Sequence, residues 1–249
     1  MLKKLKISWA VKLILSLAVI FALIAFESAE YRGEVCKGIV VKINNQYDNY
    51  FINEQDVLSM MTNNGYDVLV GQHFSDITLK TVENRIKNEA YIKRGDVYKD
   101  LKGNLMVSVD LRRPVARVVS ENGVDQYVAE DGVFLPISRK FSSRVVLVSG
   151  IKVGDRRAIG EINEGVFQMI NFINSDPFWK AQIAQIDVDG DEMILLPQVT
   201  KQYVEFGTIE NMKTKFKRLK VFYKSILPQQ GWNKYSRINL KYKDQIIAE

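Results

Sequence analysis

Hydrophobic and polar positions divide the chain into an apolar start and a longer, patterned remainder. Residues Ile7–Phe26 form one apolar segment, preceded by three lysines and followed by the acidic stretch Glu27–Glu30. Twenty helical residues span about 30 Å, which is the thickness of the hydrocarbon core of a bilayer. Lysines favour the cytoplasmic side of a membrane. The pattern therefore predicts a cytoplasmic head over residues 1–6 and a transmembrane anchor over residues 7–26.

A removable signal peptide is the alternative interpretation of this segment. Lys12 leaves an uninterrupted apolar run of only 14 residues, Leu13–Phe26, which suits a signal-peptide core. A cleavable signal also needs small residues at an Ala-x-Ala-like site, and the stretch Ala25–Glu30 offers no such pair at the required spacing. Lys12 can extend back to the headgroups, and Trp9 suits the interface. These features favour an uncleaved anchor that leaves the bulk of the chain outside the cytoplasm.

The first exterior stretch has the order strand, helix, helix, strand, strand. Asn53 with acids behind it is a helix N-cap, and period-two alternation around a Gly-Asn turn is typical of a hairpin. The expected elements are a strand at Gly38–Ile43, helices after Asn53 and over Thr78–Asn88, and strands at Val97–Leu101 and Leu105–Leu111. Two helices on one face of a three-stranded sheet make a small α+β domain, expected over residues 35–112.

Arg112-Arg113-Pro114 is the best domain boundary in the chain, because proline cannot donate to a sheet ladder. A β-rich mixed domain with two flanking helices is expected over residues 113–249, so the fold class is α+β. Its predicted strands are Val115–Ser120, Asp125–Ala129, Val133–Leu135, Val145–Val148, Ile183–Val188, Met193–Leu196, Gln202–Phe206 and Arg237–Lys243, and its helices are Ile162–Asn174 and a long one from Thr208 to Pro228.

Charge and composition exclude several functions. The chain has 35 Lys and Arg against 29 Asp and Glu, but the first 26 residues hold four lysines and no acid. The exterior part is therefore almost neutral and gives no case for nucleic-acid binding. Cys36 and His73 are the sole cysteine and histidine, so no internal disulfide can form and the usual nucleophile–base arrangements have very few candidates.

No cofactor, metal or catalytic site is expected. Asp187–Glu192 resembles a calcium loop, but a glycine and a glutamate are missing at its sixth and twelfth positions, so a hairpin turn is favoured. The sequence lacks a glycine-rich phosphate loop and the HExxH and GxSxG motifs. The basic cluster Lys213, Lys215, Lys217, Arg218 and Lys220 is interpreted as a solvated helix face, with attraction to lipid headgroups or glycan as the weaker alternative.

Several motifs in fixed order behind the anchor carry a family resemblance. They are Leu79–Ile86, Val97–Leu101, Val107–Ala116, Tyr127–Pro136, Phe206–Glu210 followed by Lys217–Leu219, and Tyr235–Tyr242. The chain resembles the bacterial cell-division family FtsQ, called DivIB in other lineages, and its first exterior domain looks like a POTRA module. The resemblance implies a non-enzymatic scaffold in the inner membrane at the division septum. Its partners would be FtsB-like and FtsL-like proteins and, through them, the septal peptidoglycan synthases.

The resemblance also implies a docking edge for the FtsB-like protein at the carboxyl-terminal strand. A last strand often lies at a sheet edge, where it can accept a partner strand, although in an average protein it is only structural. The residues carried over are Lys241, Tyr242, Lys243, Asp244, Gln245, Ile246, Ile247 and Ala248. Ladder hydrogen bonds would set the register, while Tyr242, Ile246 and Ile247 would supply burial. Lys241 stands where many members carry arginine and lacks that residue's planar fork.

Two other functions remain open at this point. A POTRA-containing module of protein export would be expected to carry further POTRA copies or a carboxyl-terminal barrel, and neither is predicted. An anchored cell-envelope enzyme is opposed by the missing catalytic residues. The POTRA-like domain would offer a second edge near Ile39–Ile43.

Overall fold

The computed structural model describes the chain except for residues 1–8, 10–11, 23–33, 45–48, 121–122 and 155–156. The predicted head lies outside the described residues, and so do residues 7, 8, 10, 11 and 23–26 of the predicted anchor. Residues 12–22 are helical and expose most of their apolar side chains. In the part of the chain that is described, no helix has both the length and the apolar character needed to cross a membrane. The anchor over residues 7–26 stays a prediction.

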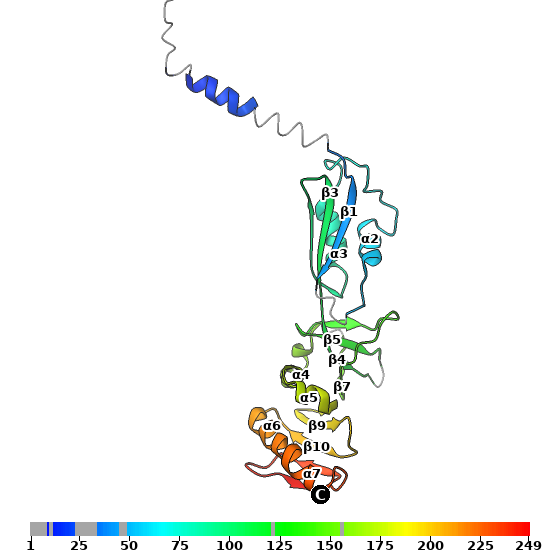
Figure 1. Ribbon diagram of the computed structural model, residues 1–249, viewed down its shortest axis with the longest axis vertical. Coiled ribbons are helices and arrows are strands. Elements are labelled where there is room, and N and C mark those ends of the chain that lie inside the picture. The colour runs from blue at the N-terminus through cyan, green and yellow to red at the C-terminus, as the bar shows by residue number, and fades with distance from the viewer. Residues whose placement is uncertain (1–8, 10–11, 23–33, 45–48, 121–122, 155–156) are drawn as a thin grey trace, which may run out of the picture. The chain divides into compact units, whose positions relative to one another are not determined.

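The chain divides into two compact units. The first comprises Met1–Asn44 and Ile52–Asp110, and the second comprises Asn45–Phe51 and Leu111–Glu249. The first has the order β1, α2, α3, β2, β3 (Figure 1). Its elements are β1 Gly38–Asn44, α2 Glu54–Met61, α3 Leu79–Lys87, β2 Ile92–Lys99 and β3 Asn104–Leu111. In its described residues the three strands form a sheet in the order β1-β3-β2. The predicted βααββ arrangement is confirmed.

Local sequence signals explain most of this first unit. Asn53 caps α2 through a reciprocal pair of hydrogen bonds with Asp56, at 2.9 and 3.0 Å. Strand β3 buries every second residue. Strand β1 pairs with β3 in parallel and lies at the edge of the sheet. The sequence predicts a second exposed edge near Ile39–Ile43, within this strand. Strand β2 begins at Ile92, five residues before the predicted start. The sequence did not reveal this part, because the buried Ile92 is followed by the exposed Lys93 and Arg94 and no alternation results.

The second unit contains a mixed sheet of nine strands within the described residues, in the order β12-β11-β10-β9-β8-β7-β4-β5-β6. The strands are β4 Pro114–Val118, β5 Gln126–Ala129, β6 Phe134–Pro136, β7 Val146–Ser149, β8 Ile183–Asp189, β9 Glu192–Pro197, β10 Tyr203–Gly207, β11 Arg237–Asn239 and β12 Ile247–Ala248. The hairpin predicted at Asp189-Gly190-Asp191 joins β8 to β9.

Helices cover one face of this sheet and bury its core. They are α4 Glu164–Ser175, α5 Pro177–Gln182, α6 Met212–Val221, a π-helical turn at Phe222–Ile226 and α7 Leu227–Gln230, with a short 3-10 turn at Ile159–Glu161 before α4 (Figure 1). Trp179 of α5 and Phe216 of α6 are buried with ring centroids 4.8 Å apart. Alternate strand residues such as Ile186, Val204 and Ile238 face these helices, and the intervening ones face the opposite side.

The helices differ from the sequence predictions in two respects. Helix α5 was not foreseen, although Asp176 accepts a hydrogen bond from Phe178 N–H at 2.9 Å and Pro177 occupies the first turn, a standard start signal. The predicted long helix from Thr208 begins only at Met212 and changes register at the π-helical turn. Pro228 has no N–H to donate to a carbonyl in the preceding turn, which favours an irregular ladder there.

Candidate partner-binding edge

Strand β12 ends the nine-stranded sheet and has one free edge within the described residues. Arg237 and Glu249 exchange two backbone hydrogen bonds of 3.1 and 3.0 Å, and Ile238 lies opposite Ala248. Because hydrogen-bonded and non-hydrogen-bonded pairs alternate between antiparallel strands, the N–H and C=O of Ala248 point away from β11. The edge therefore offers one donor and one acceptor to an added strand.

The predicted strand Arg237–Lys243 is shorter than expected. Strand β11 ends at Asn239, and the chain turns back over Tyr242–Asp244 before β12 begins. Asp244 has a positive φ of 58°, which a short polar side chain tolerates in a turn. The alternation of apolar and polar residues that predicted a longer strand continues into the turn, but the strand itself ends at Asn239. The residues predicted for docking thus belong to a hairpin, with β12 outside β11.

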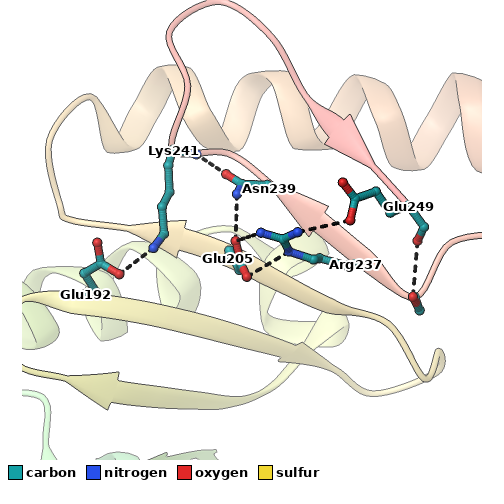
Figure 2. A network of polar contacts seen from close by, with 7 residues as sticks. Glu192, Glu205, Arg237, Asn239, Lys241 and Glu249 are labelled. Carbon is teal, nitrogen blue, oxygen red and sulfur yellow. Dashed lines mark hydrogen bonds and ion pairs between the residues drawn. The ribbon is translucent and has the colours of Figure 1, made fainter.

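A cluster of charged and polar side chains ties this hairpin to the sheet (Figure 2). Arg237 donates two parallel hydrogen bonds to the Glu205 carboxylate of β10, both 2.9 Å long, and a third to the Glu249 carboxylate at 3.0 Å. Asn239 donates to Glu205 at 2.7 Å. All four side chains lie on the sheet face opposite the helices. The forked geometry fixes β11 against β10 and the residue after β12 against β11.

Lys241 extends the same cluster to a third strand. Its N–H donates to Asn239 Oδ1 at 2.9 Å, and its ammonium pairs with the Glu192 carboxylate of β9 (Figure 2). The side chain crosses β10 at Gly207, where an added Cβ would lie 3.0 Å from Lys241 Cγ. Gly207 also has a φ of 72°, so the position favours glycine on two grounds. Lys241 therefore makes intramolecular contacts that connect the hairpin to β9, and its ammonium group is already paired.

Arg218 of α6 holds the turn from the helical side. Its Nη1 donates to the carbonyl oxygens of Tyr242 and Gln245, at 3.0 and 2.9 Å. The neighbouring Lys215 is buried and donates to the carbonyls of Phe206 and Thr208, at 2.9 and 2.8 Å. Burial lowers the pKa of Lys215. Lys220 in turn pairs with Asp176 at 2.8 Å. The interpretation of this basic cluster as a solvated face was wrong for these three members, because they make structural contacts that the sequence pattern does not reveal.

The structure brings the eight residues proposed for docking into one hairpin. Lys241, Tyr242, Lys243, Asp244 and Gln245 are exposed, and Tyr242 is 51% exposed. The pleat of β12 splits the two isoleucines: Ile246 packs with Ala248 against the helix-covered core, and Ile247 lies opposite Asn239 on the other face. Tyr242 is therefore the largest exposed apolar group of the hairpin.

The carboxylate of Glu205 links the cluster to pH. Hydrogen bonds from Arg237 hold its pKa below the ordinary value of 4.5. A lowered folded-state pKa means that ionised Glu205 contributes stability that is fully present above about pH 4.5 and is lost as the pH falls through the folded-state pKa. The hydrogen bonds to Glu205 in turn raise the pKa of Arg237, and the hydrogen bond to Glu192 raises the pKa of Lys241.

We expect Glu205→Gln to lower the melting temperature at pH 7 and to flatten its decline below pH 4.5, because the variant has no carboxylate to protonate. Thermal unfolding measured from pH 3 to pH 7 checks this. Glu161→Gln, at an exposed carboxylate outside the cluster, is the control and should follow the wild-type curve. Parallel curves for Glu205→Gln and the wild type would contradict the assignment.

The sequence did not reveal the residues that support the edge. Glu205 is a carboxylate within an otherwise apolar strand, and that isolated charge is the signal that could have marked it. Glu192, Arg218 and Glu249 carry no comparable local mark. Among the described residues, no group of three or more His, Cys, Asp or Glu side chains is arranged to hold a metal ion.

Comparison with protein families accounts for both units. Residues 34–110 match the POTRA-like domain, and residues 113–249 match the model described as FtsQ/DivIB, C-terminal related. The second match covers more than half of the chain. The chain belongs to the FtsQ/DivIB family. This membership, which the motif order had indicated, places the protein in bacterial cell division, and the FtsQ/DivIB family is one of non-enzymatic division scaffolds. Comparison with curated proteins gave no match.

Family membership and local geometry together restrict the function of this FtsQ/DivIB chain. Its relatives are membrane proteins of the division septum that work with other division proteins. The cluster around Glu205 and Arg237 holds the carboxyl-terminal hairpin against the sheet. A free strand edge is a place where a further chain can add through backbone hydrogen bonds.

Proposed function

We propose that this FtsQ/DivIB protein binds FtsB-like and FtsL-like proteins through the free edge of β12 and so links them to septal peptidoglycan synthesis. The observation that carries the proposal is the position of β12 at the sheet end, with the backbone N–H and C=O of Ala248 unpaired by a neighbouring strand. Support comes from the hairpin contacts of Arg237, Arg218 and Lys241, which hold that edge before any partner arrives.

Strand addition explains how such an edge could select a partner. A segment of the FtsB-like protein would exchange hydrogen bonds with Ala248 and continue the sheet beyond β12. Alternate side chains of that segment would lie beside Ile247 on one face and beside Ile246 on the other. Tyr242, half exposed in the turn, would cover the end of the added strand. Backbone hydrogen bonds then give affinity, and the side-chain neighbours give specificity.

The proposal includes a membrane topology for the chain. An anchor over residues 7–26 would hold the amino terminus in the cytoplasm and the two units, proposed as domains 35–112 and 113–249, outside it. The POTRA-like unit would contribute a second binding edge along β1, where Val40 and Lys42 are exposed on the sheet face that the helices leave open. Tethering suits a scaffold, because it keeps the binding edge near a membrane-bound partner.

We expect Ala248→Pro to weaken binding of the FtsB-like protein about tenfold or more. Proline removes the outward N–H and places its ring where an added strand would lie, while the bonds of β12 to β11 remain. The measurement is co-purification and titration of the full chain with the FtsB-like and FtsL-like proteins of the same cell.

Ala248→Gly keeps the outward N–H and is the matched control, which should bind like the wild type. Far-UV circular dichroism of both variants checks that the fold is unchanged. Equal binding by the proline variant, the glycine variant and the wild type would remove the strand-addition proposal.

A further inference from the structure

A second surface lies on the same unit, well separated from β12 in the strand order. A groove of about 570 Å³ lies beside the start of β4. Its walls come from Asn49 and Tyr50, from the residues around Pro114, from the loop 141–145 before β7, and from α4 and α5. In the sheet, strands β7 to β11 lie between β4 and β12. The groove therefore shares no residue with the docking hairpin.

The groove is positively charged. Arg113, Arg144 and Lys180 line it, and Glu130 is the sole acid among its lining residues. All three cations are exposed, and none forms a salt bridge with a described residue. The loop 137–145 contains Arg139 and Lys140 as well, and no acid. The three cations that line the groove, Arg113, Arg144 and Lys180, raise the local positive potential and attract anionic groups.

The walls of the groove are fixed by contacts beneath it. Tyr127 Oη lies 3.2 Å from Ser142 Oγ and accepts a hydrogen bond from Ser143 N–H at 3.2 Å. The Phe141 ring packs edge-to-face on Tyr50 and on Phe51, with centroid distances of 5.4 and 5.0 Å. These contacts hold the loop 141–145 in one position, so its arginine needs little rearrangement to bind a ligand.

Amide side chains add hydrogen-bonding capacity to the same walls. Asn49 donates to the Arg112 carbonyl at 2.9 Å, and its own Oδ1 is buried without a donor. Asn174 donates to the Val115 carbonyl at 3.0 Å, and Asn171 is exposed beside it. Amides together with an exposed tyrosine suit a peptide backbone and its side chains, as at other protein interfaces.

We propose that this basic groove binds an acidic peptide segment of a protein partner. Guanidinium groups of Arg113 and Arg144 would pair with two carboxylates through forked hydrogen bonds, with Lys180 as a third positive charge. A compact phosphate fits less well, because α4 ends at Ser175 in the groove wall and a helix carboxyl terminus repels concentrated negative charge. Carboxylates spaced along a peptide avoid that terminus. The surface adds a second contact to the scaffold and is independent of the β12 edge.

Fluorescence anisotropy with the full chain tests this inference. The probe is a fluorescein-labelled peptide of eight residues in which Glu and Ser alternate, and a peptide with Gln in place of Glu is its control. We expect the acidic peptide to bind and the Gln peptide not to bind. The double variant Arg113→Glu with Arg144→Glu should bind the acidic peptide at least about tenfold more weakly, since two charge-assisted contacts become repulsive.

Lys213→Glu with Lys217→Glu, a double reversal at exposed lysines of α6, is the matched control and should keep wild-type affinity. Equal loss in both double variants would show general attraction to a basic protein and would overturn the proposal. Displacement of the peptide by an equal concentration of inorganic phosphate would overturn it in favour of a small anion. Because the groove and β12 are separate, binding of the FtsB-like protein by the groove variant distinguishes this result from the test of the β12 edge.

Discussion

Truncation of the chain after Leu240 is expected to abolish binding of the FtsB-like protein while the second unit stays folded. The deletion removes β12, the turn and Tyr242, and with them all eight residues proposed for docking. Leu240 is fully buried and remains, and β11 keeps its parallel pairing with β10 and the forked bond from Arg237 to Glu205. We expect the melting temperature to fall by a few degrees, about 2–4 °C for each kcal/mol lost.

A single substitution in the turn sharpens this test. Tyr242→Glu should weaken binding by about tenfold to a hundredfold, because an exposed tyrosine at an interface contributes about 1.4–3 kcal/mol and the new charge cannot be desolvated. Tyr98→Glu is the matched control: Tyr98 lies in the first unit and is 49% exposed, against 51% for Tyr242. Wild-type co-purification of the truncated chain, or equal losses for the two tyrosine variants, would refute the docking edge.

Trp179→Ala is expected to be the most destabilising of these changes, lowering the free energy of unfolding by about 3–5 kcal/mol. The indole is 1% exposed and contacts the rings of Phe178 and Phe216 at 4.8 Å and of Tyr223 at 6.2 Å. Removing it leaves a cavity between α5 and α6 that surrounding side chains fill only in part. Urea unfolding followed by far-UV circular dichroism measures the loss.

Trp232→Ala controls for the removal of an indole. Trp232 is 43% exposed, and its ring lies 6.2 Å from that of the buried Tyr223, centroid to centroid. Its loss should cost less than about 1 kcal/mol. Similar unfolding curves for the two variants would show that α5, an element that sequence analysis missed, does not organise the core.

The elements that the sequence predicts correctly are those with a local signal. Asn53 and Asp56 lie three residues apart, and the alternation of β3 is carried by consecutive residues, so both can be recognised without knowing what they pack against. The edge strand β2 was recognised only in its second half. At a sheet edge, polar side chains face water on more sides, and the period of two disappears.

The supports of the candidate site could not be predicted in the same way. Glu205 and Arg237 are 32 residues apart, and Lys241 reaches a carboxylate 49 residues earlier in the chain. No local pattern connects such residues, because the register of β9, β10 and β11 brings them together. Arg218 looked like one more cation on a basic helix, and its role depends on a turn whose existence the alternating sequence concealed.

The strand order of the second unit has a consequence for synthesis. From β4 onwards, β7, β8, β9, β10, β11 and β12 each join the sheet beside the strand that precedes them in this series. Because these strands become available in order from the amino end, each new strand meets a template that is already in place. The β12 edge is the last of this series to form, so a chain that is still being made would lack that particular edge.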